Sequence, residues 1–207
     1  MSSYPPIIMI GGFIEIIELC ESCNREVIGI IDPKLLGSYL DIPVLGNDND
    51  AEEIIGQNKN CEFLICPDDP NTRFRLFGYY SAFNVKFATL ISPLARLSSH
   101  AFIGMGTIIQ HDVNVSALLK IGNFVKLNYY SNITHNVELD DFVTIAPNAV
   151  VLGYVKVGKR SYIGSNATIL PRRNIGESAV VGAGAVVTKD VYDNEICMGN
   201  PAAKLMK

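Results

Sequence analysis

Tryptophan is absent from the 207-residue sequence, and histidine occurs only three times. An excess of positive charge is also missing, because the formal net charge is −4 and the lysines and arginines are scattered. A nucleic-acid surface needs a basic excess, so we expect no nucleic-acid partner. The first apolar run, Ile7–Ile10, is far too short to span a bilayer, and we also expect no membrane insertion.

The cysteines lack the spacing of a zinc site. Cys20 and Cys23 are close in sequence, but no second pair accompanies them. The other cysteines are Cys61, Cys66 and Cys197. An odd number of cysteines without a signal peptide predicts reduced thiols and a cytoplasmic protein. We therefore expect no metal.

What the sequence does contain is a six-residue repeat. From residue 91 onward, the first position of every block of six is aliphatic, the fifth is mostly small or β-branched, and the second is often glycine. The first positions are Ile91, Leu97, Ile103, Ile109, Val115, Ile121, Leu127, Ile133, Leu139, Ile145, Val151, Val157, Ile163, Ile169, Ile175, Val181 and Val187. Neither a helix of period 3.6 nor an ordinary strand of period 2 fits this pattern. A parallel β-helix fits, with three blocks in each coil of eighteen residues, whereas a β-sandwich would not keep so strict a register.

The first ninety residues have a different pattern. Strands are predicted over 7–10, 27–31, 63–66 and 85–87, and helices over 13–23, 52–57 and 71–83. This alternation indicates a small parallel α/β sheet, so we expect two domains, residues 1–88 and 89–207. Gly11 and Gly12 lie between the first strand and helix, where a Rossmann-type unit holds phosphate, and Asp32 ends the second strand. A complete G-x-G-x-x-G is absent, so a plain tight turn is the alternative.

These features resemble a known family. The repeat is similar to the left-handed β-helix of hexapeptide-repeat acyltransferases, and the closing "GNPAAKLMK" is similar to the segment that ends many of them. Both parts together, with "IGGFIEIIEL", "GIIDPK" and "IPVLGND", resemble the sugar acetyltransferases of the sialic acid O-acetyltransferase and nucleotide-linked 4-amino-sugar N-acetyltransferase type. The resemblance implies a Rossmann-like α/β domain followed by an all-β left-handed parallel β-helix. It also implies that the first domain binds the nucleotide sugar, through Gly11, Gly12, Phe13, Asp32, Pro33 and Gly46. Asn71 and Arg73 match a further region of the family more loosely.

His135 is the candidate catalytic residue. It is the third residue of its block, a position that points outward near a corner of the coil. Its neighbours one coil away are Ala117 and Gly153, and these small residues predict an open groove beside the imidazole. The segment "SNITHNVELDDF" is similar to the family's segment in which histidine is the catalytic base. Asn136 stands where the family usually has Asp or Glu, so it can orient the ring but supplies no charge. One of the acidic residues Glu138, Asp140 and Asp141 is then a candidate to assist.

The resemblance further implies acetyl-CoA as co-substrate and a homotrimer that binds it between adjacent coils. The contacts implied for acetyl-CoA are Thr144, Gly153, Ser165 and Ala183. Thr144 stands where many relatives have a second histidine.

The function expected from these features is acetyl-CoA-dependent N-acetylation of a nucleotide-linked amino sugar, with a 4-amino-4,6-dideoxyhexose as the first choice. The resemblance places this reaction in bacterial surface glycan (lipopolysaccharide) biosynthesis. An imidazole, with an ordinary pKa of about 6.5, can take a proton from the acceptor at neutral pH. The alternatives are O-acetylation of a sugar such as sialic acid and a non-catalytic scaffold or nucleotide-binding protein.

Overall fold

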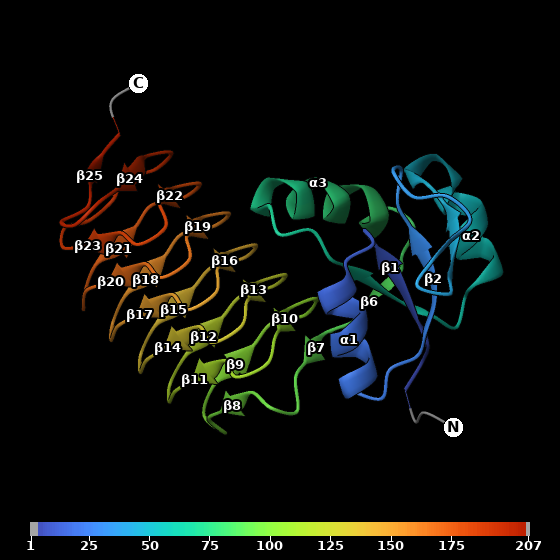
Figure 1. The fold of residues 1–207 in the computed structure, drawn as a ribbon, viewed down its shortest axis with the longest axis horizontal. Helices are drawn as coiled ribbons and strands as arrows, with labels where there is room; N and C mark the ends of the chain where they lie inside the picture. The colour runs from blue at the N-terminus through green and yellow to red at the C-terminus, as the bar shows by residue number, and fades with distance from the viewer. Residues whose placement is uncertain (1–3, 206–207) are drawn as a thin grey trace.

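The first part of the chain forms a six-stranded sheet, in a computed structural model that describes residues 4–205 (Figure 1). Its elements are β1 (Ile7–Ile10), α1 (Ile14–Ser22), β2 (Val27–Ile31), β3 (Ser38–Tyr39), β4 (Ile42–Gly46), the 3-10 helix η1 (Asp48–Asp50), α2 (Ala51–Gln57), β5 (Glu62–Ile65), α3 (Pro70–Ser81) and β6 (Lys86–Phe87). The strand order is β3-β4-β2-β1-β5-β6, and every pair is parallel except β3–β4. The predicted parallel α/β sheet is confirmed.

Helices cover both faces of this sheet because the side chains of its strands alternate between the faces. Ile7 and Met9 of β1 pack with α1, whereas Ile8 and Ile10 pack with α2 and α3. The antiparallel β3–β4 pair was not predicted. Pro43 lies in β4 and carries no N–H to donate, which weakens the sequence signal for a strand there.

The second part of the chain is a parallel coil with three sheets. The first sheet contains β7 (Leu90–Ile91), β10 (Ile108–Ile109), β13 (Lys126–Leu127), β16 (Thr144–Ile145), β19 (Tyr162–Ile163), β22 (Val180–Val181), β24 (Ile196–Met198) and β25 (Ala203–Lys204). The second contains β8 (Arg96–Leu97), β11 (Asn114–Val115), β14 (Asn132–Ile133), β17 (Val150–Val151), β20 (Thr168–Ile169) and β23 (Val186–Val187). The third contains β9 (Phe102–Ile103), β12 (Lys120–Ile121), β15 (Glu138–Leu139), β18 (Lys156–Val157) and β21 (Asn174–Ile175).

Strand pairing confirms the eighteen-residue coil expected from the repeat. Val115 pairs with Ile133, and Ile133 pairs with Val151, each eighteen residues further on. The first and fifth positions of the blocks together build one continuous apolar core along the coil. Leu97, in the first turn of the coil, is 37% exposed, because only one side of its rung is covered by another rung.

The corners of the coil turn through a residue with positive φ at the fourth position of the block. Asn136 (φ 59°) is suited to this left-handed conformation, whereas Phe124 (φ 54°) and Phe142 (φ 62°) are not. Both phenylalanines are nevertheless buried, because the six-stranded sheet and its helices cover them. We call this first part of the chain the sheet unit. Their rings stack with centroids 5.3 Å apart and an interplanar angle of 4°, and the ring of Phe77 on α3 packs against both.

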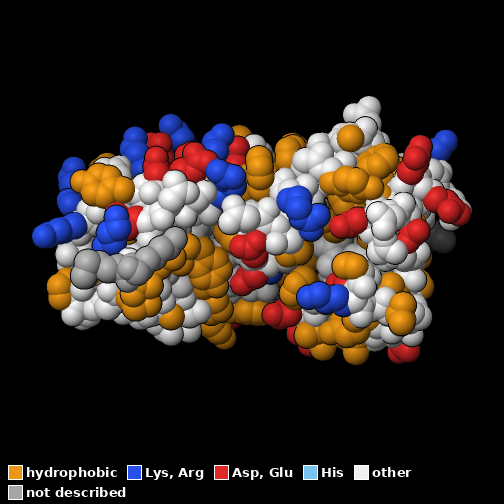
Figure 2. Space-filling view, turned by 90° about the horizontal axis from the view of Figure 1, so that it is seen from above, with side chains coloured by type: hydrophobic (Ala, Val, Ile, Leu, Met, Phe, Trp, Pro, Cys, Tyr) orange, Lys and Arg blue, Asp and Glu red, His pale blue; other side chains and the backbone are white. Residues whose placement is uncertain are grey.

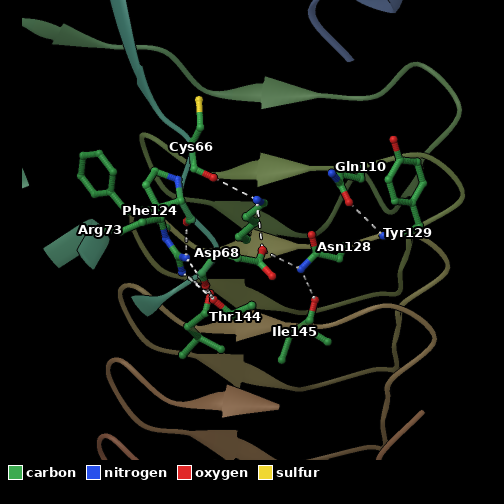
Figure 3. Close-up of polar contacts among 12 residues, drawn as sticks. Cys66, Asp68, Arg73, Gln110, Phe124, Asn128, Tyr129, Thr144 and Ile145 are labelled. Carbon is green, nitrogen blue, oxygen red and sulfur yellow. Dashed lines mark hydrogen bonds and ion pairs between the residues drawn. The ribbon is translucent and has the colours of Figure 1, made fainter. Parts of the chain in front are cut away.

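Polar contacts complete the docking of the sheet unit onto the first sheet of the coil (Figure 3). Arg73 of α3 is 1% exposed, and its guanidinium donates to the carbonyls of Phe124 and Phe142 and to Thr144 Oγ1. Lys126 Nζ of the coil donates to the Cys66 carbonyl and pairs with Asp68 at 3.0 Å. The two parts are therefore joined by an apolar stack flanked by two buried cations.

No helix within residues 4–205 is long and apolar enough to cross a membrane. The space-filling view shows charged side chains of both signs gathered along one edge of the coil (Figure 2). Apolar side chains are exposed on other parts of the same face.

Candidate active site

His135 and Asn136 form a pair at the corner between the second and third sheets, which we call the His135 corner. The side chain of His135 is exposed, as its register predicts. Its Nδ1 lies 3.1 Å from Asn136 Oδ1. An amide oxygen can only accept, so this contact requires the proton on Nδ1 and leaves Nε2 as an acceptor. The pair can therefore present a neutral imidazole as a base.

Gly153, one coil further on, leaves the space in which the imidazole lies. A Cβ at this residue would come within 2.7 Å of His135 Cε1 and 2.9 Å of Nε2. The expected small residue beside the histidine is present, but the ring itself occupies part of the predicted groove. The rings of His135 and Tyr154 are nearly perpendicular, with their centroids 5.3 Å apart, and the Arg172 guanidinium lies over the Tyr154 ring. These contacts hold the ring against the coil.

A surface cavity of about 450 Å³ lies beside this pair on the third sheet. Its lining includes Asn136, Tyr154, Phe102 and Lys120. Sequence reasoning missed Tyr154, because a large aromatic residue at a fourth position carries no signal that separates a site from an ordinary corner. A substrate arm of mixed polarity can lie in such a cavity, next to the imidazole.

The side-chain contacts of Glu138 and Asp141 are with residues other than His135, although Glu138 lines the same cavity as Asn136. Glu138 Oε2 lies 3.7 Å from Lys156 Nζ, and Asp141 accepts from the Asn123 amide. Desolvation by burial, with smaller contributions from neighbouring acidic groups, raises the pKa of Asp140. Asn136 is therefore the side chain that positions the ring in this chain.

A second cavity, of about 490 Å³, opens at the carboxyl ends of β1, β2 and β5. Gly11, Gly12, Phe13, Asp32 and Pro33 all line it, so five of the six predicted substrate-binding residues come together. The first amides of α1 lack intrahelical partners, and no side chain caps them. Free amides at the start of a helix favour an anion such as phosphate.

Asp32 shapes the turn at this cavity. Its Oδ2 accepts from the Gly12 amide at 2.9 Å, and its Oδ1 accepts from the Lys34 amide at 2.8 Å. A carboxylate offers about four acceptor positions, so two remain for ligand hydroxyls. The interpretation of Gly11 and Gly12 as a simple tight turn is incomplete, because the same residues line the cavity.

Two other residues of the first part, Gly46 and Arg73, lie outside the lining of this cavity. Gly46 does not line the cavity, and its carbonyl instead accepts from the Asp32 amide at 3.0 Å. Arg73 is buried at the docking surface, where its guanidinium donates to carbonyls of both the sheet unit and the coil. Burial lowers the pKa of Arg73 to about 10, so the side chain stays protonated at neutral pH.

Thr144 was expected to contact acetyl-CoA, but its side chain lies at the docking surface. Its side chain is 0% exposed, because the sheet unit covers this part of the first sheet. Its hydroxyl donates to the Asp68 carbonyl at 2.7 Å and accepts from Arg73. Thr144 therefore joins the two parts of the chain and cannot reach a ligand.

The remaining residues expected to contact acetyl-CoA lie at two corners. Gly153 lies under His135, whereas Ser165 and Ala183 lie at the corner between the first and second sheets. Ser165 is half-buried and Ala183 is exposed. Within a single chain, Ser165 and Ala183 therefore do not lie around His135.

Sequence reasoning also missed the ion pair between Lys126 of the coil and Asp68 of the sheet unit. Lys126 is 4% exposed, and its Nζ lies 5.5 Å from the centre of the Phe13 ring. Asn128 donates to Asp68 as well. An outward-facing lysine on a strand looks like an ordinary surface residue until the docking of the sheet unit is known.

Comparison with known proteins finds acetyltransferases that are similar in sequence and in fold. No family model matches the chain. A GDP-perosamine N-acetyltransferase from Escherichia coli O157:H7 is 40% identical over 74 residues, which are 36% of this chain and 34% of that protein. The match therefore spans about a third of that relative's length.

Solved structures match over nearly the whole chain. A histidine-to-alanine variant of the GDP-perosamine N-acetyltransferase from Caulobacter crescentus, in complex with CoA and GDP-perosamine, is 26% identical with a TM-score of 0.91, covering 98% of this chain and 97% of that one. The acetyltransferase domain of PglB from Neisseria gonorrhoeae, in complex with acetyl coenzyme A, is 26% identical with a TM-score of 0.91 and coverages of 98% and 100%. WeeI from Acinetobacter baumannii is 28% identical with a TM-score of 0.88 and coverages of 97% and 99%.

The chain is related to the nucleotide-linked amino-sugar acetyltransferases. The relation covers both the sheet unit and the coil, since the structural matches include both. The expected resemblance is confirmed at the level of this family.

Proposed function

We propose that the chain is an acetyl-CoA-dependent N-acetyltransferase that acts on a nucleotide-linked amino sugar. The observation that carries this proposal is the His135–Asn136 pair, in which Nδ1 is held and Nε2 is left as an acceptor. This pair lies on the fold of the amino-sugar acetyltransferases, one of which has been solved with CoA and GDP-perosamine. Sequence identities of 26–28% over almost the whole chain support the same class of reaction.

The chemistry needs one base and no covalent enzyme intermediate. The neutral amine of the sugar attacks the thioester carbonyl of acetyl-CoA, and a C–N bond forms. His135 Nε2 takes the proton that the amine loses, and Asn136 Oδ1 holds the Nδ1–H of the resulting imidazolium. The tetrahedral intermediate then expels the CoA thiolate, which receives the proton from Nε2. A placed base of this kind is typically worth about 10²–10⁴-fold in rate.

The nucleotide would occupy the cavity of the sheet unit. Its phosphates would meet the free amides at the start of α1, and a ribose hydroxyl would donate to Asp32. We propose on this basis that residues 1–88 are a Rossmann-like nucleotide-sugar domain and that residues 89–207 are the acetyltransferase domain. The likeness to hexapeptide-repeat enzymes supports a left-handed winding of the coil.

The assembly we propose is a homotrimer with acetyl-CoA between adjacent coils. The separation of Gly153 from Ser165 and Ala183 supports it, because residues at two corners can meet one ligand only when a second coil lies alongside. We also propose a cytoplasmic role in bacterial surface glycan biosynthesis, where nucleotide-linked amino sugars are consumed.

The test is release of free CoA thiol with a panel of nucleotide-linked amino sugars. We expect release only when acetyl-CoA and a suitable amino sugar are both present. His135→Ala should reduce the rate by about 10²–10⁴-fold. His111→Ala is the matched control, since His111 is also a third-position histidine but lies at another corner, where Nδ1 contacts Ser92 Oγ at 2.5 Å.

The same assay separates the alternatives. An N-acetyltransferase should ignore the sugar in which a hydroxyl replaces the amine, whereas an O-acetyltransferase should use it. A non-catalytic scaffold would give no turnover with any acceptor. Equal activity of the His135→Ala variant and the wild type would contradict the proposed mechanism.

A further inference from the structure

We propose that Asp48 selects the nucleotide base and that the base it selects is guanine. The inference rests on the proposed function, because it concerns the cavity in which the nucleotide would lie. Asp48 begins η1, immediately after β4, and lines this cavity together with Asp32 and the Gly11–Phe13 turn. No resemblance or spacing in the sequence singled it out.

The order of residues along the sheet edge matches the order of parts in a nucleotide sugar. Strands β4, β2, β1 and β5 are neighbours, and they are followed by Asp48, Asp32, Gly11 and Pro67 respectively. Neighbouring strands lie about 4.8 Å apart. With the diphosphate at Gly11 and the ribose at Asp32, the base reaches Asp48. The sugar then extends toward Pro67, on the side where the coil docks.

Asp48 is held in a fixed orientation by α3. The Tyr80 hydroxyl donates to Asp48 Oδ1 at 2.9 Å, and the Tyr79 hydroxyl donates to the Asp48 carbonyl at 2.8 Å. Tyr80 is 0% exposed, and burial, together with Asp48 itself, raises the pKa of its hydroxyl, which therefore stays a neutral donor. The Asp48 side chain keeps 31% of its surface exposed, and Oδ2 lies 3.8 Å from Arg75 Nη1, too far for a hydrogen bond. One edge of the carboxylate is thus left for a ligand.

Guanine is the base that such a carboxylate fits. Its Watson–Crick edge presents an N1–H and an N2 amino group side by side, and a carboxylate can accept from both. Uracil and thymine present a single N–H between two carbonyl oxygens, which a carboxylate repels. Adenine presents one amino group beside a ring nitrogen that is an acceptor. Arg75 also lines the cavity and can donate to guanine O6.

The first test uses the wild-type chain and titration calorimetry with nucleoside diphosphates, without CoA. We expect GDP to bind at least about tenfold more tightly than UDP or dTDP, the discrimination that one bidentate base contact gives. Inosine diphosphate lacks only the N2 amino group, so it should bind about tenfold more weakly than GDP. Equal affinity for GDP and inosine diphosphate, or tighter binding of UDP or dTDP, would overturn the proposal.

The second test replaces the carboxylate. Asp48→Asn keeps an oxygen for Tyr80 but loses the second acceptor, so GDP affinity should fall to that of inosine diphosphate. UDP affinity should rise or stay unchanged, because a neutral amide no longer repels the uracil carbonyls. Glu52→Gln, an exposed acidic residue on α2 outside the cavity, is the matched control and should bind GDP as the wild type does. An equal loss for all nucleotides in Asp48→Asn would contradict base selection. If this variant does not fold, the comparison of GDP with inosine diphosphate in the wild type still tests whether the N2 amino group of guanine is recognised.

The outcomes also separate this inference from the proposed function. A chain that binds no nucleoside diphosphate contradicts both. A chain that prefers UDP or dTDP, and transfers acetyl groups to the corresponding amino sugar, contradicts only the choice of guanine.

Discussion

A single histidine carries the proposed chemistry, and two neighbours determine whether it can act. Asn136 fixes the tautomer through a 3.1 Å contact, and Gly153 provides the space in which the ring lies. Neither residue contributes charge. The orientation of the imidazole, rather than an acidic partner, is therefore the feature of this site that is most sensitive to substitution.

Gly153→Ala should inactivate the enzyme without unfolding it. The added Cβ would lie 2.7 Å from His135 Cε1, so the ring must turn away, and a misplacement of about 1 Å can cost about 10²-fold in rate. The rate of thiol release measures the loss. Gly56→Ala, in α2 with nothing within 4 Å of its Cβ, is the control and should keep full activity. Full activity in Gly153→Ala would show that the ring position is not critical.

Two serines inside the coil should respond in opposite directions to removal of their hydroxyls. Ser131 Oγ has no hydrogen-bond partner among the described residues, whereas Ser161 Oγ donates to the Gly176 carbonyl at 2.6 Å. A buried unpaired hydroxyl costs about 1–3 kcal/mol, so Ser131→Ala should stabilise the fold by about 1 kcal/mol. Ser161→Ala should destabilise it by a similar amount. Chemical denaturation of the two variants gives both values, and a loss of stability in Ser131→Ala would contradict this account.

At the scale of elements, the docking of α3 on the first sheet decides how the two parts of the chain are related. Arg73 connects them through carbonyl acceptors in both the sheet unit and the coil. Phe124 and Phe142 provide the apolar part of the same surface. A change at this surface should alter stability and the relative position of the two cavities together.

Arg73→Met should destabilise the fold by at least ~3 kcal/mol, because it leaves several buried carbonyls and the Thr144 hydroxyl without their donor. Thermal unfolding measures the effect. Arg75→Met is the control, since Arg75 is 65% exposed and its ion pair with Asp48 is 3.8 Å long, so it should cost less than ~1 kcal/mol. Similar losses in the two variants would show that Arg73 is not the anchor.

Local sequence patterns predicted most helices and strands, but they did not predict the contacts between elements that are distant in sequence. The aliphatic first positions determined the register of the coil. The spacing of Gly11, Gly12 and Asp32 left a plain tight turn as an alternative, and only together with the family resemblance did it point to the cavity. Thr144 and Arg73, whose positions the sequence did not indicate, both lie where the sheet unit covers the coil. The interior pattern of a coil does not reveal which of its outer faces another unit will cover, so an exposed strand residue and a docked one look alike in sequence.

At the scale of the whole molecule, most of the thiols are buried and therefore react slowly. Cys20 and Cys66 lie in one apolar cluster of the sheet unit and Cys197 lies in the core of the coil, and desolvation by burial raises the pKa of each. For Cys20 the pKa rises to about 12. Thiolates, the reactive form, are therefore scarce at pH 8.

Alkylation with iodoacetamide at pH 8 should consequently be slow at Cys20 and Cys66 in the folded protein and fast in denaturant. Mass spectrometry of the labelled peptides reports each site separately. Cys23, which is only half-buried, is the internal comparison and should label first. Rapid labelling of Cys66 in the native state would indicate that the sheet unit detaches from the coil.

The eighteen-residue turn also limits the positions along the coil axis that a corner residue can take. Any change in the number of turns between the docking surface and His135 moves the imidazole along the axis in steps of about 4.8 Å, since strands stack at that spacing. The distance along the axis between the docking surface and His135 can thus change only in whole steps. Finer adjustment of the imidazole position must come from side chains at the corners.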